Sequence, residues 1–441
     1  MQLKQASLVP LAASGVAAQL ASNTTSNVNV PSGCSLAAGT TATSQAQLDA
    51  YAGCSTLVGD LTISGDLGNA ALSGVTVIDG SLIINNATEL GSFAADTLQR
   101  ITGTLRLQGL TILSTASFGQ LSQVDTIELI TLPGISTFTT RLNTVRNIVI
   151  SDTSLESIEG FTDLSSVGLF NINNNRYLSS IESSLHTISD GLTVSSNGQD
   201  LDVVFDNLVW ANNITLTGVQ EVSFENLQAV NGSLGFSNNT ISNIRMNSLS
   251  TVGETFTIAN NEDLLGVAFG NLTSVGGGFV VVNNTQLMDI NFPRLETIGG
   301  DLNVIGKFNQ LDLTSLKSVR GGADVETTAT NYSCDALRRL QSRGYIQGDT
   351  FVCKNGAASS SMSLSSGSSS TMSGSATASG SASASGSATA SASGSATMSS
   401  GSSSSSTDTR SHSRDHRDAG VQLVPGTTFF GLVAAVAAAL L

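Results

Sequence analysis

The chain of 441 residues repeats a short pattern about every 22 residues, and this period constrains its fold more than any other feature. Each repeat holds a segment of the form apolar, polar, apolar, and successive segments begin 20 to 23 residues apart. A fixed period of this length is typical of solenoids, in which each rung buries its apolar residues against the next. The segments begin at Leu61, Leu82, Leu105, Ile127, Ile148, Phe170, Leu192, Ile214, Leu234, Phe256, Phe279 and Leu302.

A second pattern, close to Phe-x-x-Leu-x-x-Val, lies between these segments and begins at Phe118, Phe138, Phe161, Phe224, Phe269 and Phe292. The connecting segments lack the i, i+4 spacing of a helix, and their Gly, Thr and Ser content favours extended structure. We therefore predict an all-β fold. It is a right-handed parallel β-solenoid of triangular section, leucine-rich-repeat-like in period, with about 12–13 rungs in residues 34–356.

Asparagine follows several of the predicted strands, at Asn86, Asn174, Asn260 and Asn283. Where a strand turns, backbone polar groups lose their partners and need others. We predict that these four side chains point inward and stack as a ladder that satisfies those groups.

The middle residue of each predicted strand points outward, because side chains alternate along a strand. Of these twelve residues only Arg106 and Glu128 carry a charge. Hydroxyl and amide groups can bond to sugar hydroxyls, so the candidate binding face comprises Asn171, Thr193, Thr215 and Thr257. The same residue types are also ordinary on any exposed parallel strand, and that interpretation stays open.

The four cysteines, Cys34, Cys54, Cys334 and Cys353, lie before and after the repeats. An even number in a secreted chain indicates disulfides, with three connectivities possible. Rungs stack at about 4.8 Å, so the two ends lie roughly 55 Å apart, whereas bridged Cα atoms lie within about 7 Å. Each pair must therefore close its own end, Cys34 with Cys54 and Cys334 with Cys353.

Each disulfide loop is predicted to enclose a short helix that caps the solenoid. The first covers residues 44 to 52, with a capping box formed by Ser44 and Gln47, and the second runs from Asp335 to Ser342 and ends at Gly344. Such caps cover the open sheet ends, where unpaired strands invite aggregation.

Both ends of the chain resemble processing signals. Residues 1–18 combine an early cation, an apolar run and small residues, the pattern of a secretory signal peptide. Residues 419–441 comprise a spacer and an apolar tail, the signal for replacement of the tail by a glycosylphosphatidylinositol (GPI) anchor. Asp418 is the preferred attachment residue, with Ala419 and Gly420 as alternatives. This interpretation predicts a protein on the outer leaflet of the plasma membrane and in the wall, held to the membrane through lipid only. The alternative is a tail-anchored protein.

Residues 357–417 are predicted to form a disordered, O-glycosylated stalk. Ser and Thr make up 31 of the 51 residues from 357 to 407, and such a segment has almost no large apolar groups that could offset the entropy of ordering it. Eight Asn-x-Ser/Thr sequons predict N-glycosylation. They are Asn23, Asn86, Asn213, Asn231, Asn238, Asn271, Asn283 and Asn331; Asn86 and Asn283 stay unmodified if they are buried in the ladder.

The composition leaves little material for catalysis or for binding nucleic acid. The net charge is −15 without a basic run, and only three His residues are present, so His-based metal sites and catalytic triads are not expected. The carboxylate pairs that a glycosidase needs exist at Glu262/Asp263, Asp301/Glu254 and Asp200/Asp202, but they fall at predicted turns. We predict no catalytic residue, no cofactor and no metal.

Three other features are interpreted as structural. The run Gly276 to Gly278 lacks the ending of a phosphate-binding loop and is read as a tight corner. Trp210, the only tryptophan, is read as a core or corner residue rather than a sugar-stacking platform. His186 lies between Leu185 and Ile188 and is read as structural.

Four long stretches resemble a known family: Cys54-Ser-Thr-Leu-Val-Gly-Asp-Leu-Thr-Ile63, Phe170-Asn-Ile-Asn-Asn-Asn-Arg-Tyr-Leu178, Phe205-Asp-Asn-Leu-Val-Trp-Ala-Asn-Asn-Ile-Thr215 and Ser315-Leu-Lys-Ser-Val-Arg-Gly-Gly322. The chain is similar, over residues 34–356, to the fungal GPI-anchored cell-wall organisation proteins of the extracellular-matrix and sporulation-specific wall family. The folded part of that family resembles the receptor L domain of insulin and EGF receptors.

This resemblance implies a non-enzymatic protein needed for wall integrity, wall assembly and maturation of surface glycoproteins. It supplies no catalytic residues, and unlike receptors the fungal members carry no kinase. We expect contacts with wall polysaccharide, β-glucan above all, and with wall glycoproteins. The alternatives are a wall-remodelling glycosyl hydrolase or transglycosylase, and a ligand-sensing surface co-receptor.

Overall fold

The computed structural model describes residues 31–356, which form a parallel β-solenoid of about 13 rungs. The solenoid confirms the fold class predicted from the 22-residue period, whereas its handedness and its likeness to receptor L domains stay predictions. The predicted signal peptide, stalk, anchor signal with Asp418, Ala419 and Gly420, and the sequon at Asn23 lie outside the described residues.

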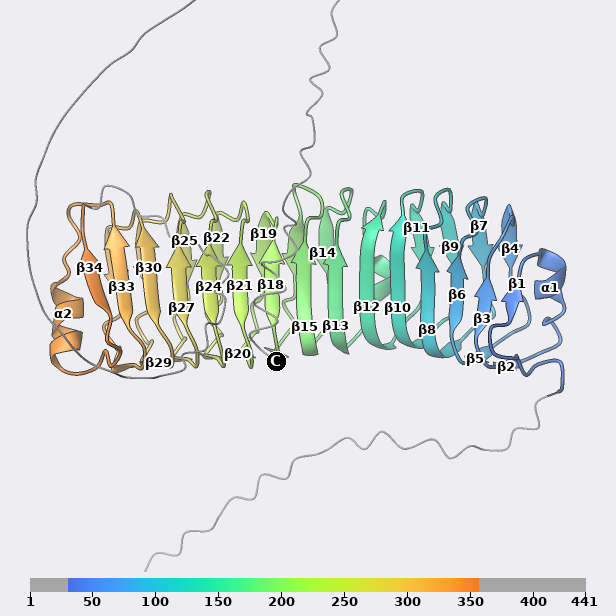
Figure 1. The fold of residues 1–441 in the computed structure, drawn as a ribbon, viewed down its shortest axis with the longest axis horizontal. Helices are drawn as coiled ribbons and strands as arrows, with labels where there is room; N and C mark the ends of the chain where they lie inside the picture. The colour runs from blue at the N-terminus through green and yellow to red at the C-terminus, as the bar shows by residue number, and fades with distance from the viewer. Residues whose placement is uncertain (1–30, 357–441) are drawn as a thin grey trace, which may run out of the picture. The chain divides into compact units, whose positions relative to one another are not determined.

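Each rung contains up to three strand segments, and neighbouring rungs pair in parallel (Figure 1). Two of the three segments belong to one 23-stranded sheet, here called the main sheet. In five rungs they merge into one long strand: β8 Arg100–Gln108, β10 Gln123–Leu132, β12 Thr144–Thr153, β13 Ser166–Asn173 and β15 Thr187–Ser195.

In the other rungs the two segments of the main sheet are separate strands. The first segments are β2 Thr56–Val58, β5 Val77–Asp79, β17 Trp210–Ala211, β20 Ala229–Val230, β23 Thr251–Val252, β26 Ser274–Val275, β29 Thr297–Ile298 and β32 Ser318–Val319. The second segments are β1 Thr41–Ala42, β3 Leu61–Ile63, β6 Leu82–Asn85, β18 Ile214–Thr217, β21 Leu234–Ser237, β24 Phe256–Ala259, β27 Phe279–Val282, β30 Leu302–Gly306, β33 Ala323–Thr327 and β34 Phe351–Lys354.

The third segments form three smaller sheets on the other side of the core. One holds β4 Asn69–Ala71, β7 Ser92–Ala94, β9 Thr115–Ser117 and β11 Thr137–Thr139. The next holds β14 Ser180–Glu182, β16 Asp202–Val204 and β19 Glu221–Ser223, and the last holds β22 Asn243–Arg245, β25 Gly266–Ala268, β28 Asp289–Asn291 and β31 Gln310–Asp312. A short 3₁₀ helix, η1, covers Glu159–Phe161.

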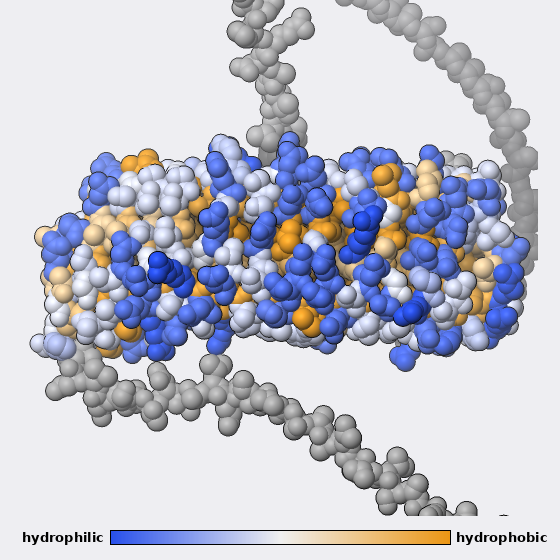
Figure 2. Space-filling model, turned by 180° about the vertical axis from the view of Figure 1, so that it is seen from behind, coloured by the Kyte–Doolittle hydropathy of each residue, from blue (hydrophilic) through white to orange (hydrophobic). Residues whose placement is uncertain are grey.

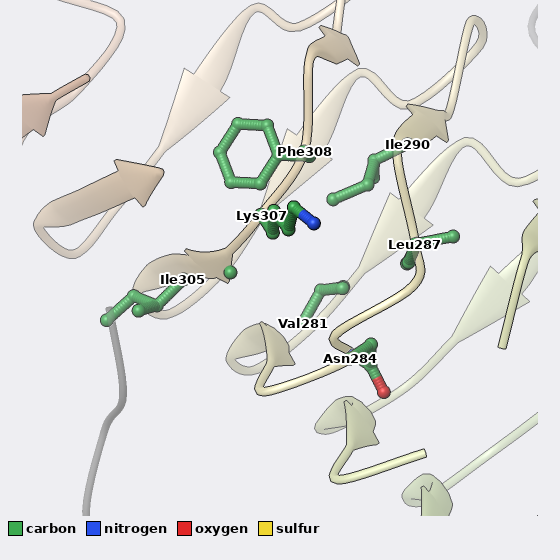
Figure 3. Close-up of a pocket in the computed structure, with 8 residues that line it drawn as sticks. Val281, Asn284, Leu287, Ile290, Ile305, Lys307 and Phe308 are labelled. Carbon is green, nitrogen blue, oxygen red and sulfur yellow. The ribbon is translucent and has the colours of Figure 1, made fainter. Parts of the chain in front are cut away.

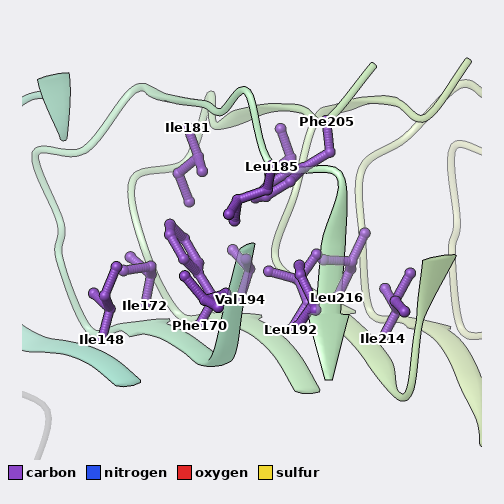
Figure 4. Close-up of a cluster of buried hydrophobic side chains, with 14 of the residues drawn as sticks. Ile148, Phe170, Ile172, Ile181, Leu185, Leu192, Val194, Phe205, Ile214 and Leu216 are labelled. Atoms are coloured by element: carbon purple, nitrogen blue, oxygen red, sulfur yellow. The ribbon is translucent and has the colours of Figure 1, made fainter. Parts of the chain in front are cut away.

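The core lies between the main sheet and the smaller sheets. Figure 4 shows Phe170 and Leu192 of the main sheet facing Ile181 and Phe205 across it. Each of these four side chains is at most 1% exposed, because the apolar, polar, apolar pattern points two residues of every strand inward. From behind (Figure 2), hydrophilic residues cover most of the surface, with hydrophobic residues in a broken band along the long axis.

One corner of the solenoid uses a left-handed residue in eleven successive rungs. The eleven have φ between 52° and 91° and are Gly65, Asn86, Gly109, Thr131, Asp152, Asn174, Ser196, Gly218, Asn238, Asn260 and Asn283. Gly and Asn tolerate this conformation better than other residues, which explains their recurrence at the end of each strand. The predicted inward ladder was therefore wrong by one residue, because these Asn residues turn the chain and the following residue points inward.

The real ladder consists of Asn175, Asn197, Asn239, Asn261 and Asn284. Each Oδ1 accepts a backbone N–H from the preceding rung at 3.0 to 3.1 Å: Asn175 from Thr153, Asn197 from Asn175, Asn239 from Val219, Asn261 from Asn239, and Asn284 from Asn261. The Nδ2 groups donate to backbone carbonyl oxygens in the strand of the preceding rung, as Asn261 Nδ2 does to the carbonyl oxygen of Phe236 at 3.1 Å. The ladder thus satisfies the backbone groups that the corner leaves without partners.

Another corner is closed by stacked glycines, as predicted for Gly276 to Gly278. A Cβ at Gly276 would overlap the carbonyl oxygen of Gly253, and one at Gly299 would overlap that of Gly276. Successive rungs approach too closely there for any other residue.

Disulfides close both ends of the solenoid with the predicted pairing. Cys34 joins Cys54 with Cα atoms 5.6 Å apart, and Cys334 joins Cys353 at 5.9 Å. The loops enclose helices α1 Gln45–Asp49 and α2 Asp335–Ser342. No helix in residues 31–356 is long and apolar enough to cross a membrane.

The predicted capping box of α1 was wrong in detail, and this helix is shorter than residues 44 to 52. Ser44 is the N-cap, but its side chain makes no capping bond. The Oε1 atom of Gln47 instead accepts the backbone N–H of Thr43 at 2.6 Å. Gln47 therefore reaches back one residue further than a capping box requires.

Candidate functional site

The predicted outward residues form one continuous column along the main sheet. Asn171 pairs in register with Thr193, Thr193 with Thr215, Thr215 with Gly235, and Gly235 with Thr257. All five are partly exposed. The structure therefore brings the four candidate binding residues onto one face.

A second polar column lies beside the first and was not predicted. It comprises Asn173, Ser195, Thr217 and Ser237, each two residues after a member of the first column and partly exposed. The signal was present in the sequence, because residues i and i+2 of a strand share a face. We call the two columns together the polar face: Asn171, Asn173, Thr193, Ser195, Thr215, Thr217, Gly235, Ser237 and Thr257.

Within the described residues, no side-chain hydrogen bond involves any of the six hydroxyl groups of the polar face, which belong to Thr193, Ser195, Thr215, Thr217, Ser237 and Thr257. Only the two amides of its first rung are bonded: Asn173 Nδ2 donates to Asn171 Oδ1 at 2.9 Å, and Asn173 Oδ1 accepts a bond from Ser151 Oγ, outside the face, at 2.6 Å. Neighbouring rungs lie about 4.8 Å apart, Gly235 interrupts the hydroxyls of the first column, and each hydroxyl can donate and accept.

Charged residues border the polar face without entering it. Toward the N-terminus, Arg106 and Glu128 form an ion pair in the same column, and the bond to Glu128 raises the pKa of Arg106. Toward the C-terminus, burial and the charge of Glu326 raise the pKa of Asp324, one of whose carboxylate oxygens is buried without a partner in residues 31–356. The stretch between these two ends contains no ionisable side chain in either column.

The predicted glycosylation sites differ in accessibility. Asn86, Asn231, Asn238, Asn271 and Asn331 are exposed, while Asn213 and Asn283 are partly buried. Asn86, Asn238 and Asn283 occupy the left-handed corner, directly after a strand. Their occupancy stays a prediction.

Side-chain hydrogen bonds hold the two partly buried sequon residues, as they also hold the exposed Asn231 and Asn271. Asn213 Oδ1 accepts the backbone N–H of Ser233 at 2.8 Å, so this side chain supports the next rung. Asn283 Nδ2, the atom that a glycan would modify, donates to Asn260 Oδ1 at 3.0 Å. Both residues therefore contribute to the structure in the unmodified state.

The carboxylates considered for glycosidase chemistry bond to turns of the chain or lie exposed. Asp301 Oδ1 accepts the backbone N–H of Gly322 at 2.7 Å, and Glu254 Oε2 accepts a bond from Ser233 Oγ at 3.4 Å. The remaining members, Glu262, Asp263, Asp200 and Asp202, are exposed or partly exposed. Residues 31–356 contain no group of three or more His, Cys, Asp or Glu residues placed to hold a metal ion.

One interpretation of a single residue was wrong. Trp210 is neither a core nor a corner residue: Ala211 is buried and Trp210 partly exposed, so alternation places the indole on the outer surface of the main sheet. His186 is exposed between the buried Leu185 and Ile188, and its interpretation as a structural residue stays a prediction. Its backbone carbonyl accepts the N–H groups of Val209 and Trp210.

Two cavities of the described residues are smaller than typical ligand pockets. One has a volume of about 10 Å³, room for about one water, and is lined by residues that include Val281, Asn284 and Phe308 (Figure 3). A second, of about 200 Å³, lies between α2 and β31 and is lined by Tyr332, Leu337 and Arg343 among others. Burial raises the pKa of Tyr332 to about 12.

The fold and its surface define a class of protein: a parallel β-solenoid with disulfide-closed ends and an uncharged polar sheet face. Structural disulfides persist outside the reducing cytosol. No family model matches the chain.

Sequence comparison identifies the family. The chain is 51% identical over 322 residues to Cell wall mannoprotein PST1 of Saccharomyces cerevisiae, which covers 73% of this chain and 72% of that protein. It is 38% identical over 330 residues to Cell surface GPI-anchored protein ECM33 of Candida albicans (74% and 79%). It is 36% identical over 328 residues to Cell wall protein ecm33 of Schizosaccharomyces pombe (73% and 77%).

The chain therefore belongs to the family of fungal cell-wall and GPI-anchored cell-surface proteins that includes PST1 and ECM33. This membership confirms the predicted family and the predicted location at the cell surface and in the wall.

Proposed function

We propose that this protein organises the cell wall without catalysing a reaction, through contacts between its polar face and wall polysaccharide of the β-glucan type. Contacts with wall glycoproteins, also expected from the sequence, would use the same surface. The observation that carries the proposal is the array of six hydroxyl groups without side-chain hydrogen bonds on an uncharged stretch of the main sheet.

The chemistry of the face matches that of a neutral polysaccharide. Sugar hydroxyls donate and accept hydrogen bonds, as the Thr and Ser hydroxyls do, and neither partner must lose a charge on binding. Each contact is weak, but rungs repeat along the sheet as sugars repeat along a chain. Many weak contacts along one polymer then act together, as in other multivalent binding.

A binding and product assay tests this proposal. The secreted protein is mixed with insoluble β-glucan and with chitin; the bound fraction is measured by sedimentation and the supernatant is analysed for new oligosaccharides. The test variant, Thr193→Val, Thr215→Val and Thr257→Val together, removes three hydroxyls and keeps the shape of the side chains. Val149 and Val280 already occupy the same column, so the fold tolerates this change.

The matched control, Thr251→Val, Ser274→Ala and Thr297→Val, removes three hydroxyls from another outer column of the main sheet. We expect the wild type and the control to sediment with β-glucan, and the test variant to bind at least fivefold less. New or shortened oligosaccharides would show an enzyme instead, and equal binding of the two variants would rule out the polar face.

A further inference from the structure

Trp210 lies on the outer surface of the main sheet, away from the polar face. Its neighbours in register are Thr187 on the preceding rung and Ala229 on the next. Thr187 is exposed and Ala229 is small, and no aromatic ring of residues 31–356 contacts the indole. The structure therefore leaves a large apolar ring partly exposed on a surface of small polar residues.

Asn231 is a diagonal neighbour of Trp210 on the same face. It lies one residue beyond β20, at the corner that continues into the stacked glycines, and its side chain is exposed on the outer surface. The backbone N–H of Asn231 donates to the carbonyl oxygen of Ala211 at 3.0 Å, so Asn231 lies beside the residue that follows Trp210. Asn231 is exposed and begins the sequon Asn231-Gly232-Ser233.

The amide nitrogen of Asn231 points toward the strand that carries Trp210. Asn231 Nδ2 donates to Asn212 Oδ1 at 3.1 Å, and Asn212 follows Trp210 by two residues on the outer face. Since Nδ2 is the atom to which an N-linked glycan attaches, its first sugar would start above this strand.

We propose that the first N-acetylglucosamine of a glycan on Asn231 packs against the indole of Trp210. The ring face of the sugar carries C–H groups and its N-acetyl group a methyl, which suit the apolar indole face, while the indole N–H can donate to a sugar oxygen. Docking would bury the exposed ring and hold the glycan flat against the main sheet. The inference rests on occupancy of this sequon and is independent of polysaccharide binding by the polar face.

The fluorescence of Trp210 tests the proposal directly, because the chain contains one tryptophan. The full chain is secreted from yeast, and peptide mass spectrometry measures the occupancy of Asn231. Emission and acrylamide quenching are compared for the wild type, for wild type trimmed to its first N-acetylglucosamines, and for Asn231→Gln. Ser233→Ala abolishes the same sequon and keeps Asn231. Asn331→Gln, at an exposed sequon near α2, is the matched control.

Asn231→Gln and Ser233→Ala are expected to shift the emission to longer wavelength and to raise the quenching constant about twofold. The trimmed wild type and Asn331→Gln should behave as the untreated wild type, because both keep the sugar beside the indole. Three results would overturn the proposal: an unoccupied Asn231, unchanged emission in both sequon variants, or a change in wild-type emission on adding soluble β-glucan fragments. The last result would make Trp210 a site for wall sugars.

Discussion

The Asn ladder predicts a large loss of stability from one buried side chain. Asn261 is fully buried; its Oδ1 accepts bonds from the backbone and side-chain amides of Asn239 at 3.0 Å, and its Nδ2 donates to Phe236 and Asn284 at 3.1 Å. In Asn261→Ala the backbone N–H of Asn239 stays buried without a partner, which costs about 1–3 kcal/mol. The three other lost bonds cost about 0.5–1.5 kcal/mol each. We expect a loss of about 5 kcal/mol in the free energy of unfolding.

Urea unfolding of the secreted protein, followed by circular dichroism, measures this loss. The matched control is Asn291→Ala at the exposed end of β28, where no side-chain bond is lost and the change should stay within about 0.5 kcal/mol. If Asn261→Ala lost less than 1 kcal/mol relative to Asn291→Ala, the ladder would not be what stabilises this corner.

Three further predictions concern the corners, the ends and the charges. Gly276→Ala forces a Cβ into the backbone of the neighbouring rung and should lower the free energy of unfolding, measured with urea, by about 1–3 kcal/mol. Replacing both Cys34 and Cys54 by Ser should lower the free energy of unfolding by about 3 kcal/mol, measured as a lower Tm. Reducing agent should have no further effect on this variant through the N-terminal end. Hydrogen bonds from Ser117 and the Gly119 N–H lower the pKa of Asp96, and burial raises that of Asp324, from an ordinary value of 3.8. Asp96→Asn should therefore lower Tm at pH 7, and Asp324→Asn should raise it. Both differences should vanish as pH falls below 3.8, and the difference for Asp96→Asn should vanish at the lower pH. Differences of the same sign would contradict this assignment.

The period and the residue pattern were sufficient to predict the solenoid, its strands and its end disulfides. Twelve strand starts repeat at a nearly constant spacing, and only stacked rungs bury all their apolar residues at once. Stacking also separates the two ends, so the cysteine pairing followed from distance. The first column of the polar face followed from alternation along the same strands, whereas the second column was missed although the same rule places it there.

The sequence did not determine details that depend on backbone conformation. An Asn after a strand can turn the chain or point inward, and Asn174 and Asn175 do one each. Only the φ angle of the residue directly after the strand decides which Asn turns the chain and which points inward. Trp210 was misassigned for a related reason: apolar character suggests burial, but the two-residue strand β17 gives too short a pattern to fix which side faces out.

The central claim is that the polar face links this protein to wall organisation. The most direct measurement is the growth, under wall stress, of cells whose only copy carries Thr193→Val, Thr215→Val and Thr257→Val, at an equal amount of surface protein. We predict that these cells are as sensitive as cells lacking the protein, while the Thr251, Ser274 and Thr297 control grows as wild type. Wild-type growth of the polar-face variant would contradict the claim.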